Sequence, residues 1–170
     1  MYILNVYEEG IRLLLDRRSI RKFQQKPVPK ELIKKAIDIA RHAPSAKNLQ
    51  PWQFIVVYNR EKIVEMSRAG RGASPLSGAP VAIAVVVDPQ TSPITYLVDG
   101  AIASTYLWLA LHALGLGAVW INSLRYDIYY DILGVDRDKV IVSVFAVGYP
   151  AEQPPPRPRK GLDEIVGFLE

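Results

Sequence analysis

The chain has 170 residues, 49% hydrophobic and 22% charged, so it can bury a core, and its composition excludes a disordered or fibrous protein. Its formal net charge is only +4, and acidic residues interrupt the basic ones along most of the chain, which argues against a broad nucleic-acid-binding surface. The absence of cysteine excludes disulfides, iron–sulfur ligation, thiolate metal sites and cysteine nucleophiles. Neither a signal-peptide pattern nor a membrane-spanning apolar stretch is present, so we expect a cytoplasmic protein.

The predicted elements begin with two amphipathic helices. Asn5 and Glu8 resemble a helix-capping pair, and apolar residues at helical spacing then predict a helix ending near Asp16. Pro29 suits a first helical turn and opens a second helix, which Pro44 stops. Farther along we expect a buried strand over 54–58, a short helix over 61–69, a loop over 70–75, a buried strand over 81–87, a long helix over 98–114, a strand over 118–121, a short helix over 128–133 and a strand over 140–147.

The long helix over 98–114 is apolar on most of its sides, which places it in the middle of the fold or at a subunit interface. Because helices flank and alternate with four apolar strands, we predict an α+β fold with a sheet covered by helices, in a single domain over residues 1–170. The proline-rich segment 154–160 cannot be helical. Residues 151–170 are therefore expected to form a tail that docks on another part of the protein.

Three segments carry polar groups that suit a single ligand. Residues 17–21, Arg-Arg-Ser-Ile-Arg, supply three guanidinium groups and a hydroxyl, which suit a phosphate. The loop from Pro44 to Trp52 supplies a hydroxyl and two amides, which suit the polar edge of a flat heterocycle. Arg157 and Arg159 add two cations from the tail. Each segment alone has an ordinary explanation, because arginines complement helix C-termini and amides are common in loops. Together they match the phosphate, ribityl chain and pyrimidine edge of flavin mononucleotide (FMN).

At these residues the chain resembles the FMN-dependent nitroreductases. The resemblance rests on residues 17–23 and 43–54, and it continues through 99–101, 115–121 and 148–150. It implies a nitroreductase-like fold, with a central, mainly antiparallel sheet flanked by helices, a long buried central helix and an intertwined homodimer with shared FMN sites. In such a dimer the tail would dock on the partner, and part of the loop before the first strand would serve the partner's cofactor.

The resemblance also implies roles for individual residues. Arg17 and Ser19 would meet the phosphate and ribityl chain, while Arg21 would approach the N1 side of the ring, where a cation favours reduction. Arg71 is assigned to the same side, with a solvent-exposed loop arginine as the alternative. The expected cofactor-binding residues are Arg17, Arg18, Ser19, Arg21, Pro44, Ser45, Ala46, Asn48, Gln50, Arg71, Asn122, Ser123, Arg157 and Arg159.

Two features depart from the pattern of the family. Where many relatives place an acidic residue and a glycine beside flavin N5, this chain has Asn122 and Ser123, and we expect the backbone N–H of Ser123 to reach N5. The connection between Val87 and Asp99 is brief. Helices that cover the substrate pocket in longer members are therefore expected to be missing, which would leave a more open site.

The expected function is that of an NAD(P)H-dependent FMN oxidoreductase, which passes electrons from NADH or NADPH through flavin N5 to a nitroaromatic, quinone or flavin acceptor by a ping-pong mechanism. FMN carries the chemistry, so no catalytic side chain is expected. No metal site is expected, because His42 and His112 lie far apart without companion ligands. No nucleic-acid or membrane partner is expected either. The alternatives are another flavin chemistry on this fold, such as dehalogenation, flavin cleavage or reduction of a specialised metabolite, and a basic module that binds nucleic acid.

Overall fold

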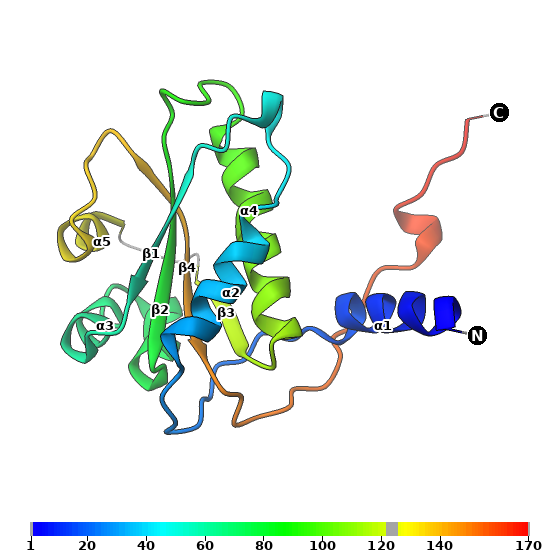
Figure 1. Ribbon diagram of the computed structural model, residues 1–170, viewed down its shortest axis with the longest axis horizontal. Helices are drawn as coiled ribbons and strands as arrows, with labels where there is room; N and C mark the ends of the chain where they lie inside the picture. The colour runs from blue at the N-terminus through cyan, green and yellow to red at the C-terminus, as the bar shows by residue number, and fades with distance from the viewer. Residues whose placement is uncertain (1, 122–125, 170) are drawn as a thin grey trace.

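A four-stranded antiparallel sheet forms the centre of the computed structural model, which describes residues 2–121 and 126–169 (Figure 1). Its strands are β1 (Trp52–Val57), β2 (Val81–Val87), β3 (Gly117–Ile121) and β4 (Val140–Gly148), in the order β1-β2-β4-β3. All three neighbouring pairs are antiparallel. The predicted α+β fold around an antiparallel sheet is therefore confirmed.

Helices cover both faces of this sheet (Figure 1). One face carries α2 (Lys30–Ala40) and α4 (Tyr96–Ala113), and the other carries α3 (Arg60–Met66), the 3₁₀ helix η2 (Arg71–Gly78) and α5 (Tyr126–Leu133). The central strand β2 is buried along its whole length, because its alternate residues serve two separate cores. Ile83 packs in the core beneath α2 and α4, whereas Ala84 packs in the core beneath the other three helices.

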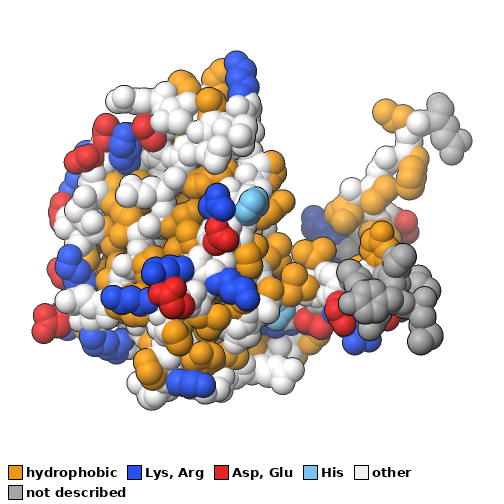
Figure 2. Space-filling model, viewed as in Figure 1, with side chains coloured by type: hydrophobic (Ala, Val, Ile, Leu, Met, Phe, Trp, Pro, Cys, Tyr) orange, Lys and Arg blue, Asp and Glu red, His pale blue; other side chains and the backbone are white. Residues whose placement is uncertain are grey.

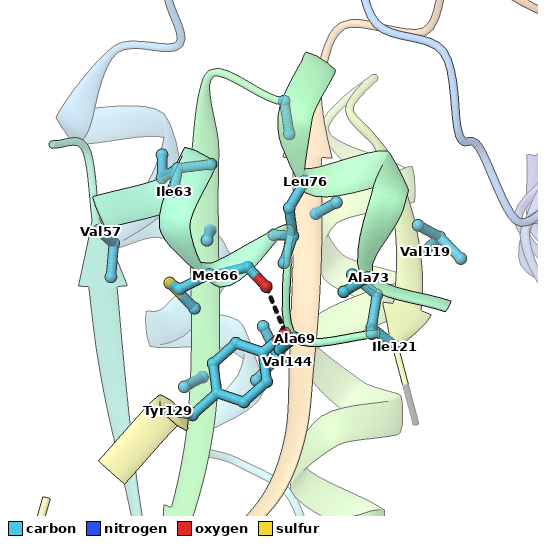
Figure 3. Packing of buried hydrophobic residues seen from close by; sticks show 14 of the residues in the cluster. Val57, Ile63, Met66, Ala69, Ala73, Leu76, Val119, Ile121, Tyr129 and Val144 are labelled. Atoms are coloured by element: carbon cyan, nitrogen blue, oxygen red, sulfur yellow. Dashed lines mark hydrogen bonds between the residues drawn. The ribbon is translucent and has the colours of Figure 1, made fainter. Parts of the chain in front are cut away.

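The core on the α3 side is held by an aromatic residue with a satisfied hydroxyl. The ring of Tyr129, from α5, is fully buried, and its hydroxyl donates a hydrogen bond of 2.9 Å to the carbonyl oxygen of Met66 at the end of α3 (Figure 3). Burial of a tyrosine is tolerated when its hydroxyl finds such a partner. This contact joins α5 to α3.

The central helix α4 lies close against the sheet because of one glycine. A Cβ atom added to Gly100 would lie 2.6 Å from Cγ1 of Val87 and 2.8 Å from Cγ2 of Val142, so any larger residue would push the helix away. Seven residues of α4 are buried, while Leu97, Val98 and Tyr106 on its outer side are exposed.

The two ends of the chain extend away from this body (Figure 1). They are α1 (Tyr2–Asp16) and a C-terminal segment that contains the 3₁₀ helix η3 (Leu162–Glu164). Hydrophobic side chains lie along both segments (Figure 2), and Leu15 and Phe168 are 68% and 86% exposed. Among the helices of the described residues, none has the length and apolarity needed to cross a membrane.

The first two predicted helices differ from the structure at their N-terminal ends. α1 already begins at Tyr2, so Asn5 and Glu8 lie inside the helix and the predicted capping pair is wrong. Pro29 has φ −61° and ψ 139° and is the N-cap of α2 instead of a residue of its first turn. Proline fits this position because its fixed φ suits both extended and helical backbone.

Two later expectations also need correction. β1 was expected to be buried, but most of its residues are half-buried because it is an edge strand with a single neighbour, β2. The segment expected as a loop over 70–75 contains the start of η2, which opens with a hydrogen bond of 3.0 Å from the N–H of Ala73 to the oxygen of Gly70. Short 3₁₀ turns leave little periodicity in a sequence.

Candidate functional site

Five arginines from the two ends of the chain line one surface hollow of about 310 Å³, which we call the arginine hollow. The polar side chains on its wall are Arg17, Arg18, Ser19, Arg21, Arg157 and Arg159. Leucines of α1 and prolines 154–156 supply the apolar part of the wall, and none of the described lining residues is acidic. Uncompensated guanidinium groups at this density suit a multiply charged anion such as a phosphate.

Arg17 is the most constrained of these arginines. Its guanidinium carbon lies 3.9 Å from the ring centroid of Trp108 in α4, and its Nη1 atom is buried with no hydrogen-bond partner among the described residues. Burial lowers the pKa of Arg17, and the charges of Arg18 and Arg159 lower it further. A buried donor without a partner is costly, so Nη1 is well suited to donate to a bound anion. By this observation an FMN phosphate fits the hollow.

Arg18 has a different role from Arg17, although the two are adjacent. Its Nη1 donates to the carbonyl oxygen of Leu15 at 2.6 Å and to that of Arg17 at 3.0 Å. Leu15 belongs to the last turn of α1 and Arg17 directly follows the helix, where a cation complements the helix dipole. For Arg18 the helix-end explanation therefore accounts for the contacts.

The tail reaches the hollow because Glu152 attaches it to the segment over residues 17–22, which we call the arginine run. One carboxylate oxygen of Glu152 accepts hydrogen bonds from the backbone N–H groups of Arg21 at 2.6 Å and Lys22 at 3.1 Å. The N–H of Ala151 also donates to the oxygen of Lys22 at 3.0 Å. The tail then turns toward Arg157 and Arg159 on the wall of the hollow.

The loop over 44–50, which contains the 3₁₀ helix η1 (Ala46–Asn48), lies near the other end of α4 (Figure 1). The N–H of Ala46 donates to Oδ1 of Asp99 in the first turn of α4 at 3.1 Å. Asp99 is nine residues before Trp108, which corresponds to about 14 Å along the helix axis. Within one chain, the loop and the arginine hollow are therefore separate groups of residues.

The two amide residues of this loop lie on the surface of the chain. Pro44, Asn48 and Gln50 are exposed, whereas Ser45 and Ala46 are half-buried. The Ser45 hydroxyl accepts a hydrogen bond of 3.0 Å from the N–H of Gln50, which closes the loop on itself. The loop therefore carries two exposed amide side chains, Asn48 and Gln50, that are accessible to a flat ligand.

The remaining expected residues are not brought to the hollow. Arg71 is exposed at the first residue of η2 and is not part of the hollow's wall, so its assignment to the N1 side of the ring stays a prediction. Asn122 and Ser123 lie outside the described residues.

Three residues at the site were not assigned a role by the sequence pattern. Trp108 is one of many apolar residues in the long helix, and Glu152 is an acid just before the proline-rich segment, so neither stands out in the sequence. Asp99 belongs to one of the segments that resemble the family, and an acid in the first turn of an otherwise apolar helix is a usable signal of a buried polar contact. Neither Trp108 nor Glu152 has such a signal, because their partners are distant in sequence.

Comparison with known proteins places the chain and its fold in one family. The model of the "Nitroreductase family" matches residues 14–75 and 67–149. A "Putative NADH dehydrogenase/NAD(P)H nitroreductase" from Methanothermobacter thermautotrophicus is 40% identical over 155 residues, covering 88% of this chain and 81% of that protein. A crystal structure of a protein of the same name from Parabacteroides distasonis has a TM-score of 0.88 at 31% identity, covering 95% of this chain and 99% of that one.

A second solved structure is that of an FMN-dependent nitroreductase from Clostridium difficile. Its TM-score is 0.83 at 31% identity, and the match covers 94% of this chain and 99% of that one. The chain belongs to the nitroreductase family. The predicted family and its nitroreductase-like fold are therefore confirmed.

Proposed function

We propose that the protein moves electrons from NADH or NADPH, through the N5 position of bound FMN, to a nitroaromatic, quinone or flavin acceptor by a ping-pong mechanism. Family membership and the names of the relatives support the enzyme class, an NAD(P)H-dependent oxidoreductase, and the cofactor, FMN. The single observation that carries the proposal is Arg17, which lines the arginine hollow and whose buried Nη1 has no hydrogen-bond partner among the described residues.

The residues of the hollow would hold the phosphate end of the cofactor. Arg17 would donate Nη1 to a phosphate oxygen, and Arg157 and Arg159 would add charge from the tail. The hydroxyl of Ser19, on the same wall, would serve the ribityl chain. Arg21 also lines the hollow and is exposed, so its cation is available to the part of the cofactor beyond the phosphate.

The proposed unit is a homodimer whose two chains share each FMN site. The loop over 44–50 is joined to Asp99, about 14 Å along α4 from Trp108, and it is not part of the wall of the arginine hollow. α1 and the C-terminal segment expose apolar side chains away from the body, among them Leu14 at 60% and Ile165 at 64%, as expected of segments that pack on a partner. Shared sites would place the loop of one chain against the ring held by the other.

The experiment is an anaerobic titration of the FMN-loaded protein with NADH and with NADPH. At least one donor should bleach the yellow absorbance of the flavin, and addition of a quinone or nitroaromatic should restore it. A protein that remains colourless and takes up no FMN would contradict the proposal. Bound flavin that neither donor reduces would instead favour another flavin chemistry on the same fold.

The nucleic-acid-binding alternative has less support. Arg17 is half-buried and stacks on Trp108, and Arg18 is bound to carbonyl oxygens at the end of α1. A surface that tracks a nucleic-acid backbone needs exposed cations that can each reach a phosphate. The arrangement of Arg17 and Arg18 is better suited to one small anion.

A further inference from the structure

We infer that Asp99 is a positioning residue for the flavin-binding loop over 44–50, acting through the N–H of Ala46. The inference rests on the proposed function, in which this loop holds the polar edge of the flavin. Asp99 touches no cofactor in this arrangement. Its role would be to fix the backbone that carries Asn48 and Gln50.

Both carboxylate oxygens of Asp99 accept hydrogen bonds. The side chain is only 2% exposed, Oδ1 accepts from the N–H of Ala46 at 3.1 Å, and Oδ2 accepts from the hydroxyls of Ser92 and Thr95 at 2.9 Å each. Burial raises the pKa of Asp99, but these donors outweigh it, and the pKa lies below its ordinary value. Asp99 is therefore an ionised acceptor at neutral pH, and Ala46 is the group that joins it to the loop.

The loop needs such an anchor because its backbone is strained. Lys47, Asn48 and Gln50 have φ of 51°, 57° and 48°, in the left-handed region that non-glycine residues enter at a cost of about 1–2 kcal/mol each. Strained residues persist when their surroundings hold them in place. The contacts within the loop, such as that from Gln50 Nε2 to the oxygen of Asn48 at 3.1 Å, do not fix it to the body.

Among the hydrogen bonds of the described residues, two join the loop and the residue that follows it to the rest of the body. Asp99 holds the N-terminal end through Ala46, and the N–H of Asp88 donates to the oxygen of Pro51 at 2.9 Å at the C-terminal end. The position of Asp99 relative to the sheet is set by the next residue, Gly100, which lets α4 lie close to Val87 of β2 and Val142 of β4. Without the Asp99 contact, the Pro51 contact would be the one remaining hydrogen bond, among those of the described residues, between this segment and the sheet or α4.

A second buried polar group on α4 offers a matched control. The hydroxyl of Ser104 donates to the oxygen of Gly100 at 2.7 Å and lies 2.8 Å from the hydroxyl of Ser143. Ser104 and Ser143 are fully buried, as Asp99 nearly is, but within the described part of the chain their side-chain hydrogen bonds do not involve the loop. A Ser104→Ala variant therefore loses buried hydrogen bonds on the same helix without releasing the loop.

The test measures FMN affinity by titration of the apoprotein and amide hydrogen exchange of residues 45–50 without FMN. Asp99→Ala should weaken FMN binding about tenfold and speed exchange in the loop, since an unsatisfied buried donor has a cost of this order. Asp99→Asn should restore both readouts, because its Oδ1 can accept from Ala46 and its Nδ2 can donate to the hydroxyls of Ser92 and Thr95. Should Asp99→Ala fail to fold, Ala46→Pro removes the same N–H from the loop side, and it follows an extended Ser45 that suits proline.

Four outcomes decide the matter. Weaker FMN binding in Asp99→Ala and Ala46→Pro, with near wild-type binding in Asp99→Asn and Ser104→Ala, supports the positioning role. Wild-type affinity in Asp99→Ala overturns it while leaving the proposed function intact. An equal loss in Ser104→Ala also overturns it, because the effect would then be general destabilisation. A wild-type chain that binds no FMN overturns the proposed function, and the inference falls with it.

Discussion

The guanidinium of Arg17 stacks on the indole of Trp108, with 3.9 Å between the guanidinium carbon and the ring centroid. The indole is fixed in turn, because its Nε1 donates to the oxygen of Ala118 at 3.1 Å, and the same oxygen accepts from the N–H of Ile20. Ala118 also forms a parallel bridge with Ser19. One tryptophan therefore joins α4, β3 and the arginine run, and it presents Arg17 to the hollow.

Two substitutions of Trp108 should separate the contribution of its stacking on Arg17 from the contribution of its Nε1 hydrogen bond. Trp108→Phe keeps an aromatic face under Arg17 but loses the Nε1 donor, so the free energy of unfolding should fall by about 1 kcal/mol. Trp108→Leu also loses the cation–π contact and should lose about 2–3 kcal/mol. Urea denaturation measures both. FMN affinity should fall more in the leucine variant, and equal affinities in the two variants would show that the stack does not position Arg17.

Release of the tail should weaken the site without changing its arginines. Glu152→Ala removes the acceptor for the N–H groups of Arg21 and Lys22, so Arg157 and Arg159 should spend less time on the wall of the hollow. We expect faster proteolysis after residue 152 and FMN affinity reduced about fivefold to tenfold.

Glu164→Ala is the control for this variant. The carboxylate of Glu164 accepts from the N–H of Gly161 at 2.7 Å, a local contact within the exposed C-terminal segment. Its loss should leave FMN affinity unchanged. A similar loss of affinity in both variants would assign the effect to the tail as a whole instead of to the Glu152 attachment.

The protonation of His112 should respond to an anion in the hollow. Burial lowers the pKa of His112, the charge of Arg17 lowers it further, Asp16 raises it, and Arg18 lowers it. A bound anion would offset the arginine charges that oppose protonation of His112. The pKa of His112 should therefore rise when the anion binds. An NMR titration with and without sulfate, whose charge is constant over this pH range, measures the change.

Arg17→Gln provides the comparison for His112. Removal of one nearby cation should raise the pKa of His112 before any anion is added, and the further rise with sulfate should be smaller. A pKa that falls, or does not move, when sulfate is added to the wild-type chain would show that the anion does not bind near Arg17.

Elements with a strong local pattern could be predicted from the sequence. The bounds of β2 are as expected, because seven consecutive apolar residues indicate a strand buried on both faces. The long helix was predicted to within two residues at its start. The start of α1 and the 3₁₀ helix η2 were missed, since α1 makes few contacts with the body and η2 is too short to show a period.

The candidate site could be predicted only in part. Residues 17–21, Arg157 and Arg159 were grouped from the sequence because a phosphate needs several cations, and the structure brings them together. The sequence does not show that the 44–50 loop is separate from these cations, because the length of α4 sets the distance between the loop and the hollow. The stack of Arg17 on Trp108 could not be predicted, because the two residues are distant in the sequence and meet only in the tertiary structure.

The most direct measurement is the affinity for FMN and for riboflavin, which lacks the phosphate, in the wild-type chain, in Arg17→Gln and in Lys22→Gln. Lys22 is an exposed neighbouring cation outside the hollow, so its variant changes charge alone. The wild type should bind FMN at least about tenfold more tightly than riboflavin, Arg17→Gln should remove most of that preference, and Lys22→Gln should keep it. Equal affinities for the two flavins in the wild type, or an unchanged preference in Arg17→Gln, would contradict a phosphate site at Arg17.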